Sequence, residues 1–231
     1  MEDRRAALLR ELERADEAIA AELAEVDELY VACETARGRA LELEAFLGRL
    51  PDERAQAARE VEETRRAAAS ARAAAGKAAE EVAAAKLERN SERQAAARRF
   101  EVRARDALRI GARRAEEAGE RAAALEAEAR TAAREAEGLD ARARELATAL
   151  RERSRVAVEA GEKPTPGPAG VAEWGTRARA ALLVARSQLV TERDAVVRQA
   201  NELGASVLGE ALPATSAAGV ARRVERELGR S

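Results

Sequence analysis

The sequence predicts an all-α protein, with a long Ala-rich antiparallel coiled-coil or helical-hairpin rod and a small C-terminal helical module. Ala, Glu, Lys, Leu and Arg make up 161 of the 231 residues, well above the roughly one-half that marks long helices. Apolar residues recur every three or four positions over long stretches. Only 41 residues are Leu, Ile, Val or Phe, too few to fill the core of a compact globule of this length.

Charge and residue types narrow the class of function. The chain has 43 acidic and 41 basic residues, so no global field attracts nucleic acid or an anionic membrane. It has no His and one Cys, which excludes His-based acid–base chemistry, His-ligated metals and a disulfide framework. No Walker, Gly-x-Ser-x-Gly, Cys-x-x-Cys or Gly-x-Gly-x-x-Gly pattern occurs. We therefore expect no enzymatic activity, no cofactor and no metal.

The hydropathy of the sequence and its first residues indicate where in the cell the protein is located. No apolar stretch approaches the ~20 residues that a membrane span needs. The charged segment from Met1 to Arg5 leads directly into a helical pattern, without the apolar core of a secretory signal. We expect a cytoplasmic protein with no membrane span.

The first predicted helix covers most of the first fifty residues. Apolar residues are separated by three or four positions from Leu8 to Leu50. Pro51 disfavours helical geometry at Leu50, and Pro51 followed by Asp52 and Glu53 suits the first turn of a new helix. We expect the first helix to end near Gly48, with a hairpin or a sharp kink at 48–52. Cys33 lies on the apolar stripe of this helix and is interpreted as a small buried hydrophobic residue.

Two stretches between Asp52 and Ala160 keep a heptad, and we call each row of apolar heptad positions a seam. The first seam consists of Ala57, Val61, Thr64, Ala68, Ala71, Ala75, Ala78, Val82 and Ala85. The second consists of Ala104, Leu108, Gly111, Ala115, Ala118, Ala122, Leu125, Ala129, Ala132, Ala136, Leu139, Ala143, Leu146 and Leu150. An alanine seam lets two helix axes approach closely but buries little area per residue, so its stability must come from length.

The segment 88–92 between the seams has two interpretations. Ser91 with Gln94 resembles a capping box, which favours a turn. Val82 and Ala104 are 22 residues apart, two eleven-residue repeats, which favours one continuous helix.

Residues 161–170 form the clearest boundary, with three prolines and three glycines. This linker separates an elongated coiled-coil region, 1–160, from a C-terminal association module, 171–231. The module contains two apolar rows at heptad spacing and a short helix from Ala217 to Leu228, which Ser216 caps. The residues expected to bind a partner are Trp174, Leu182, Leu183, Leu189, Val190, Val196, Val197 and Leu203.

Over most of residues 5–155 the heptads and composition are similar to those of bacterial coiled-coil proteins that serve as scaffolds or as arms of chromosome-segregation proteins. This similarity is shared by unrelated helical rods. The function we expect is structural: a scaffold or spacer that self-associates and docks partners. A homodimer or other homo-oligomer is predicted, because the alanine seams and the C-terminal rows are hard to bury within one chain.

An alternative function is association with nucleic acid. Residues 86–114 contain ten basic and four acidic residues, and such a window can contact phosphates without sequence preference. The candidate contacts are Arg93, Arg98, Arg99, Arg103, Arg105, Arg109, Arg113 and Arg114. The opposing interpretation is a solvated helix face, because these side chains from Arg98 on spread over about half of the helix circumference.

Overall fold

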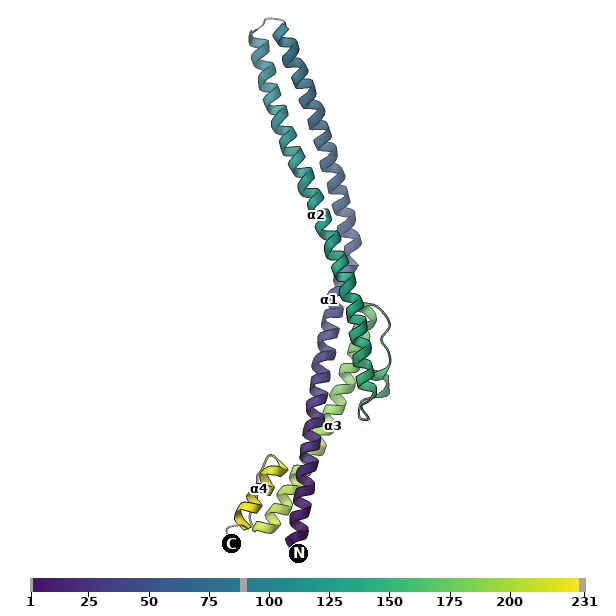
Figure 1. Ribbon diagram of the computed structural model, residues 1–231, viewed down its shortest axis with the longest axis vertical. Helices are drawn as coiled ribbons and strands as arrows, with labels where there is room; N and C mark the ends of the chain where they lie inside the picture. Colours follow the sequence, from purple (N-terminus) through teal and green to yellow (C-terminus); the bar gives the residue numbers. More distant parts are fainter. Residues whose placement is uncertain (1, 88–90, 229–231) are drawn as a thin grey trace. The chain divides into compact units, whose positions relative to one another are not determined.

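The computed structural model describes residues 2–87 and 91–228 and confirms the all-α class (Figure 1). Its elements are α1 (Glu2–Leu87), α2 (Ser91–Arg151), a short 3₁₀ helix η1 (Val158–Gly161), α3 (Pro168–Leu208) and α4 (Ala217–Leu228). No β-strand occurs among the described residues. The chain divides into two compact units: unit 1 contains residues 1–42 and 136–231, and unit 2 contains residues 43–135.

Unit 2 is an antiparallel pair formed by the second half of α1 and the first part of α2 (Figure 1). Ion pairs of 2.6 Å and 2.7 Å join Glu60 to Arg121 and Arg54 to Glu126. Residue n of α1 therefore lies opposite residue ~180 − n of α2, and the two helices run in opposite directions for about 68 Å at 1.5 Å per residue. The predicted turn or continuous helix at 88–92 falls largely on residues 88–90, which lie outside the described residues.

Both predicted seams are the packed sides of their helices. Every seam residue is buried or half-buried, including Ala78, Ala85, Ala118 and Ala143 at 2% exposure or less. Alanine permits this close packing: a Cβ added to Gly111 would lie 3.3 Å from the Ala68 Cα. The heptad pattern therefore identified the buried side of each helix.

The predicted helix end near Gly48 and the hairpin at 48–52 are wrong, because α1 continues through Pro51. Proline removes one backbone donor and crowds the preceding turn, which costs about 3 kcal/mol in a helix interior. Pro51 itself is exposed, whereas Leu43 and Leu50 are buried on the same helix. The packing of α1 on α2 therefore outweighs the local preference of proline for a helix break.

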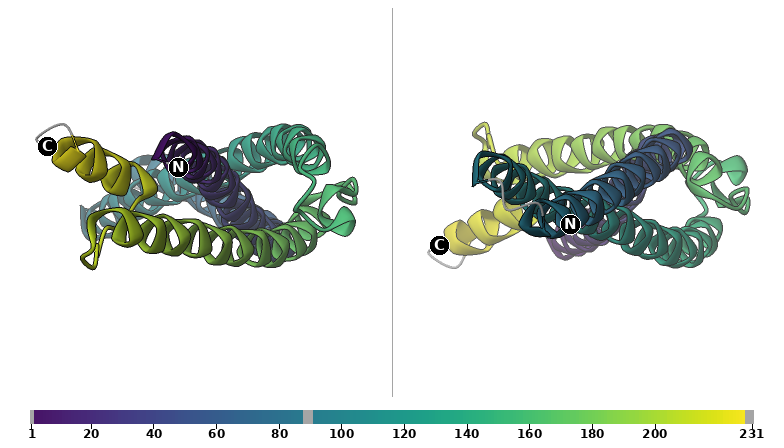
Figure 2. Two further views of the ribbon diagram at one scale, coloured as in Figure 1. Left: turned by 90° about the horizontal axis from the view of Figure 1, so that it is seen from below. Right: turned by 90° about the horizontal axis from the view of Figure 1, so that it is seen from above.

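Unit 1 has a three-helix core. It consists of residues up to 42 of α1, the end of α2 and the first half of α3, and its buried side chains include Val26, Leu146, Trp174, Leu182 and Leu189. The helices α1 and α3 are antiparallel, since Arg186 pairs with Asp27 at 2.7 Å and Arg193 pairs with Asp16 at 2.8 Å. Farther along, α4 folds back beside the end of α3 (Figure 2) and shares a second core with Leu9.

The Pro/Gly segment 161–170 does not separate two bodies as the sequence predicted, because both of its flanks belong to unit 1. The segment is held at several points. Arg151 donates a hydrogen bond to the Gly161 carbonyl at 2.7 Å, and Pro164 is buried. The Gly167 amide donates to the Asp140 carboxylate at 2.9 Å and 3.1 Å. Gly167 has φ 96°, a conformation that favours glycine, so its sequence suits an ordered turn into α3.

The C-terminal helix begins at the predicted residue. It spans Ala217–Leu228, and the Ser216 hydroxyl accepts a hydrogen bond from the Gly219 amide at 3.2 Å. Val220 and Val224 are buried. A contact that the sequence did not indicate adds to this cap: the carboxylate of Asp16, on α1, accepts a hydrogen bond from the Ala217 amide at 2.9 Å.

The Pro51→Ala variant should be more stable than the native chain. Alanine restores the missing donor and relieves the crowding, so the free energy of unfolding should rise by up to about 3 kcal/mol. Denaturant unfolding followed by far-UV circular dichroism measures this. The exposed neighbour Asp52 supplies the control, since Asp52→Ala should change stability by less than about 0.5 kcal/mol. Unchanged or lower stability of Pro51→Ala would contradict the packing argument.

Removing the Asp16 carboxylate should loosen α4. Asp16 is 3% exposed and binds both Arg193 and the first amide of α4, so Asp16→Ala should cost about 2–3 kcal/mol. Hydrogen exchange should show lost protection in α4 before the three-helix core opens. Asp27→Ala is the matched control, because its pair with Arg186 is half-exposed and should be worth less than about 1 kcal/mol. Equal effects of the two substitutions would refute the capping role.

Candidate functional site

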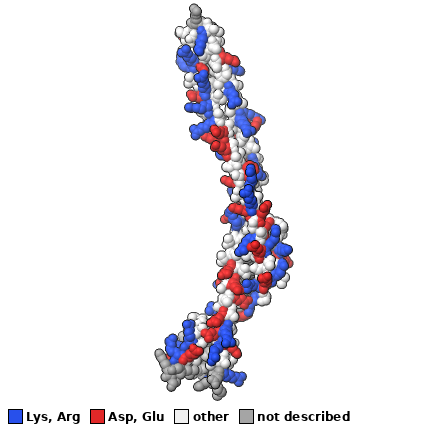
Figure 3. Space-filling model, viewed as in Figure 1, with Lys and Arg blue, Asp and Glu red and all other residues white. Residues whose placement is uncertain are grey.

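The two halves of unit 2 carry opposite charge. Residues 65–114, which contain the α1–α2 connection, have 14 basic and 6 acidic residues, a net charge of +8. The remainder of unit 2, 43–64 and 115–135, has 6 basic and 12 acidic residues, a net charge of −6. In Figure 3, blue side chains gather toward the upper end of the view. The basic window predicted on α2 therefore lies opposite further basic residues on α1.

The antiparallel geometry sorts these cations into faces. A local two-fold axis relates the helices of an antiparallel pair, so equivalent heptad positions of both helices lie on the same side. Glu60 and Arg121, which each precede a seam residue, confirm this by pairing across the helices at 2.6 Å. The positions that follow Thr64, Ala71, Ala85, Ala104 and the buried Ala97 lie on the opposite side, and Arg109 lies beside them, four residues after Arg105. There we define the cationic face as Arg65, Arg72 and Lys86 of α1 with Arg98, Arg105 and Arg109 of α2.

Most of the cationic face has no carboxylate partner. All six side chains are exposed. Arg105 bonds Glu101, and Arg109 lies 3.8 Å from Asp106. No ion pair to a described residue forms at the other four cations, namely Arg65, Arg72, Lys86 and Arg98. Between residues 65 and 86 of α1 the remaining positions of this face are Ala or Gly. The face therefore presents uncompensated positive charge.

The predicted nucleic-acid residues do not all share this face. Arg98, Arg105 and Arg109 belong to it. The other five predicted residues are exposed, but their heptad positions place them on the outer side of α2 or on the side opposite the cationic face. They are Arg93, Arg99, Arg103, Arg113 and Arg114. Sequence reasoning missed Arg65 and Arg72 because it examined one helix at a time. Their position directly after seam residues Thr64 and Ala71 is the signal that could have identified them.

The opposite face of the basic half has shallow apolar depressions. One, of about 540 Å³, is lined by Ala67, Ala107, Ile110 and Arg114 among others. A second, of about 350 Å³, includes Phe100. Ile110 is 49% exposed and Phe100 is 44% exposed. Acidic Glu63 and Glu81 line the same depressions, so this face has mixed charge.

The predicted partner-binding residues of α3 separate into three groups. Trp174, Leu182 and Leu189 are fully buried in the unit 1 core, and the Trp174 indole Nε1 donates to the Ala160 carbonyl at 3.0 Å. Val196, Val197 and Leu203 are half-buried. Only Leu183 and Val190, at 44% and 38% exposure, are available at the surface. The C-terminal rows are thus largely buried within one chain, which removes the reason given for a homodimer. The homodimer itself stays a prediction.

An apolar groove of about 580 Å³ lies between η1 and α3 in unit 1. Val158 and Val184, which are 81% and 57% exposed, line it together with Ala157, Ala180 and Ala181. Arg155 and Arg177 also line it. Ser154, Glu159 and Gln188 complete the polar part of the lining. Most of the lining side chains are apolar, so the groove can supply apolar contact.

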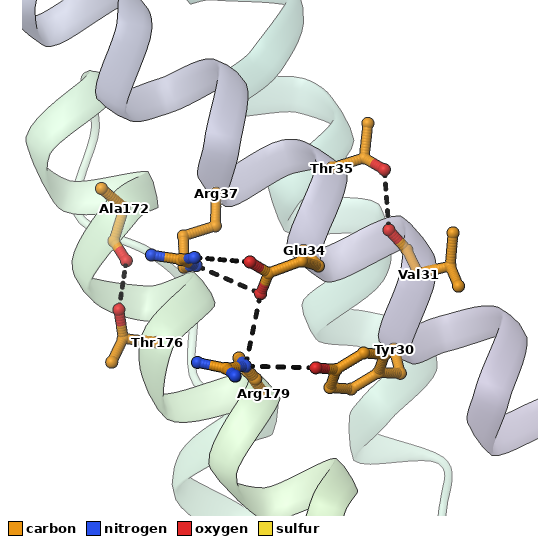
Figure 4. Close-up of polar contacts among 8 residues, drawn as sticks. All are labelled: Tyr30, Val31, Glu34, Thr35, Arg37, Ala172, Thr176 and Arg179. Atoms are coloured by element: carbon orange, nitrogen blue, oxygen red, sulfur yellow. Dashed lines mark hydrogen bonds and ion pairs between the residues drawn. The ribbon is translucent and has the colours of Figure 1, made fainter.

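A polar cluster joins α1 to α3 beside the buried core (Figure 4). Arg37 Nε donates to Glu34 at 3.2 Å, and Arg179 Nε donates to the Tyr30 hydroxyl at 3.2 Å and lies 3.5 Å from Glu34. The hydrogen bond from Arg37 and the positive charges of Arg37 and Arg179 lower the pKa of Glu34 against a smaller opposing effect of burial. A carboxylate held ionised between two guanidinium groups serves to align helices. It is poorly suited to proton transfer.

Comparisons with protein-family models, with curated proteins and with solved structures found no match. Within the described residues, no group of three or more His, Cys, Asp or Glu side chains is placed to hold a metal ion. None of the described helices has the length and apolar character needed to cross a membrane.

Cys33 should be almost inert in the folded protein. Its side chain is completely buried in the unit 1 core. Burial raises the pKa of the thiol from 9.0 to about 11, although Arg142 acts in the opposite sense. At pH 8 the thiolate fraction should fall about 100-fold, so alkylation by iodoacetamide should be slower by at least that factor than in the denatured chain. Labelling at similar rates in both states would contradict the buried position.

Proposed function

We propose that this chain is a non-enzymatic structural protein in which unit 2 is a spacer arm and unit 1 is a docking body. The observation that carries the proposal is the architecture of unit 2: two helices, paired over about 68 Å, pack their seam residues against each other. Because this pairing buries the alanine seams, the arm offers a partner its length, a charged surface and the shallow apolar depressions at Phe100 and Ile110.

Unit 1 supports the docking role. Its core is held by large side chains, including Trp174 and Leu182, and by ion pairs between α1 and α3. The groove at Val158 and Val184 and the exposed Leu183 supply apolar surface outside this core. A rigid body with an exposed apolar patch is a common form of protein-binding surface.

A spacer function depends on length, which can be altered without disturbing the seams. Deletion of 57–63 together with 116–122 removes one heptad from each helix at matched levels, because these segments lie opposite each other in the pair. The arm should shorten by about 10 Å and keep its fold, as checked by circular dichroism. In cells that lack the native chain, the shortened protein should fail to restore the normal phenotype.

The control restores length with a different surface. In this variant both deleted heptads are replaced by heptads that keep apolar residues at the seam positions but have a new order of Glu and Arg outside them. It should restore the phenotype if distance matters. Full complementation by the shortened arm would contradict the spacer function, and failure of the length-restored arm would show that the deleted residues themselves are needed.

A further inference from the structure

We propose that the cationic face of unit 2 binds the phosphate backbone of nucleic acid without reading base sequence. This inference goes beyond the spacer role, because it assigns a ligand class to one side of the arm. It also differs from the basic window on α2 alone, because half of the face comes from α1.

The face has the dimensions of a backbone contact. Arg65 and Lys86 mark its ends and are 21 residues apart on α1, or ~32 Å at 1.5 Å per residue. A turn of duplex DNA is about 34 Å long. By the pairing register, Arg109, Arg105 and Arg98 of α2 lie at levels between these ends. Cations from both helices thus lie along a strip about as long as one turn of duplex DNA.

The chemistry of the face favours phosphate. Five of its six cations are arginines, whose planar donors match phosphate oxygens in bidentate geometry. Arg65, Arg72, Lys86 and Arg98 have no ion pair to a described residue, so phosphate need not displace a carboxylate there. Binding is then driven by release of the counterions condensed on nucleic acid.

Other anionic partners fit this face less well. A membrane surface requires bulky apolar residues beside the cations, whereas the apolar residues here are alanines and Val102. A second copy could offer its acidic half, but Glu60 and Glu126 of that half already pair with Arg121 and Arg54. The experiment below also detects binding to a membrane and to a second copy of the chain.

The test measures binding of the full chain to a fluorescent 24-base-pair DNA duplex by anisotropy between 50 and 250 mM salt. Duplex RNA and single-stranded DNA of equal length are parallel probes. Four phosphate contacts predict that log K falls against log salt with a slope of about −3.6 on duplex DNA, and six predict about −5.4. Scrambled duplexes should bind equally.

Two matched variants separate the face from net charge. The face variant combines Arg65→Gln, Arg72→Gln, Lys86→Gln and Arg98→Gln. The control variant combines Lys77→Gln, Arg99→Gln, Arg103→Gln and Arg114→Gln, which removes the same charge from exposed residues on other sides of the same half. The face variant should lose about 3.6 units of salt slope, whereas the control should keep most of the slope. Replacing Arg65, Arg72 and Arg98 by Lys should preserve the slope.

All seam residues are untouched in these variants, and circular dichroism verifies folding. The proposal is overturned by any of four results: no salt-dependent retention of any of the three probes by the native chain at 50 mM salt; equal losses in the face and control variants; binding to vesicles with 30% anionic lipid but not to nucleic acid; or a salt-dependent doubling of mass in light scattering with no nucleic-acid binding.

Discussion

Close approach of helices through small side chains is the constraint on which both units depend. In unit 2, Gly111 lies so near Ala68 that an added Cβ would be 3.3 Å from its Cα. In unit 1, a Cβ on Gly204 would lie 2.5 Å from Leu212 and 2.6 Å from Val220. Each such contact buries little area, so the hydrophobic gain per residue is small. A pair built in this way must be long and uninterrupted, and this explains why α1 tolerates Pro51 without breaking.

The two units meet this constraint differently. Unit 2 relies mainly on its seam of small residues, so its stability depends on the length of the pair. Unit 1 concentrates large side chains, with Trp174 and Leu182 fully buried, and adds Asp16, a buried carboxylate that joins α3 and α4 to α1. Exposed ion pairs such as Arg186 with Asp27 contribute less than about 1 kcal/mol each. Their value lies in fixing which residues of α1 and α3 face each other.

Local patterns in the sequence predicted the features that depend on nearby residues alone. The seams and the Ser216 cap depend on spacing and on one side chain, and both were found. The helix end at Pro51 was not, because the cost of proline is local while the compensating packing comes from α2. The linker at 161–170 was misjudged for a related reason. Its composition suits a flexible segment, but it is held by Asp140, 27 positions before Gly167, and by Arg151, 10 positions before Gly161. The cationic face could not be predicted from either helix alone, because its residues come from both α1 and α2 and lie on one side only when the two helices pair.

The charge distribution of unit 2 is independent of what folds it. Seam positions take about two residues in seven, and the other positions can carry either sign without changing the packing. Interleaved Glu and Arg at i,i+4 would suit helix stability best, as in the pair of Glu62 and Arg66. Instead, acidic residues outnumber basic ones in one half, and basic residues outnumber acidic ones in the other. Separation of this kind gives up some of the small gain from local pairs and provides a directional field, which stability does not require and which an anionic partner can use.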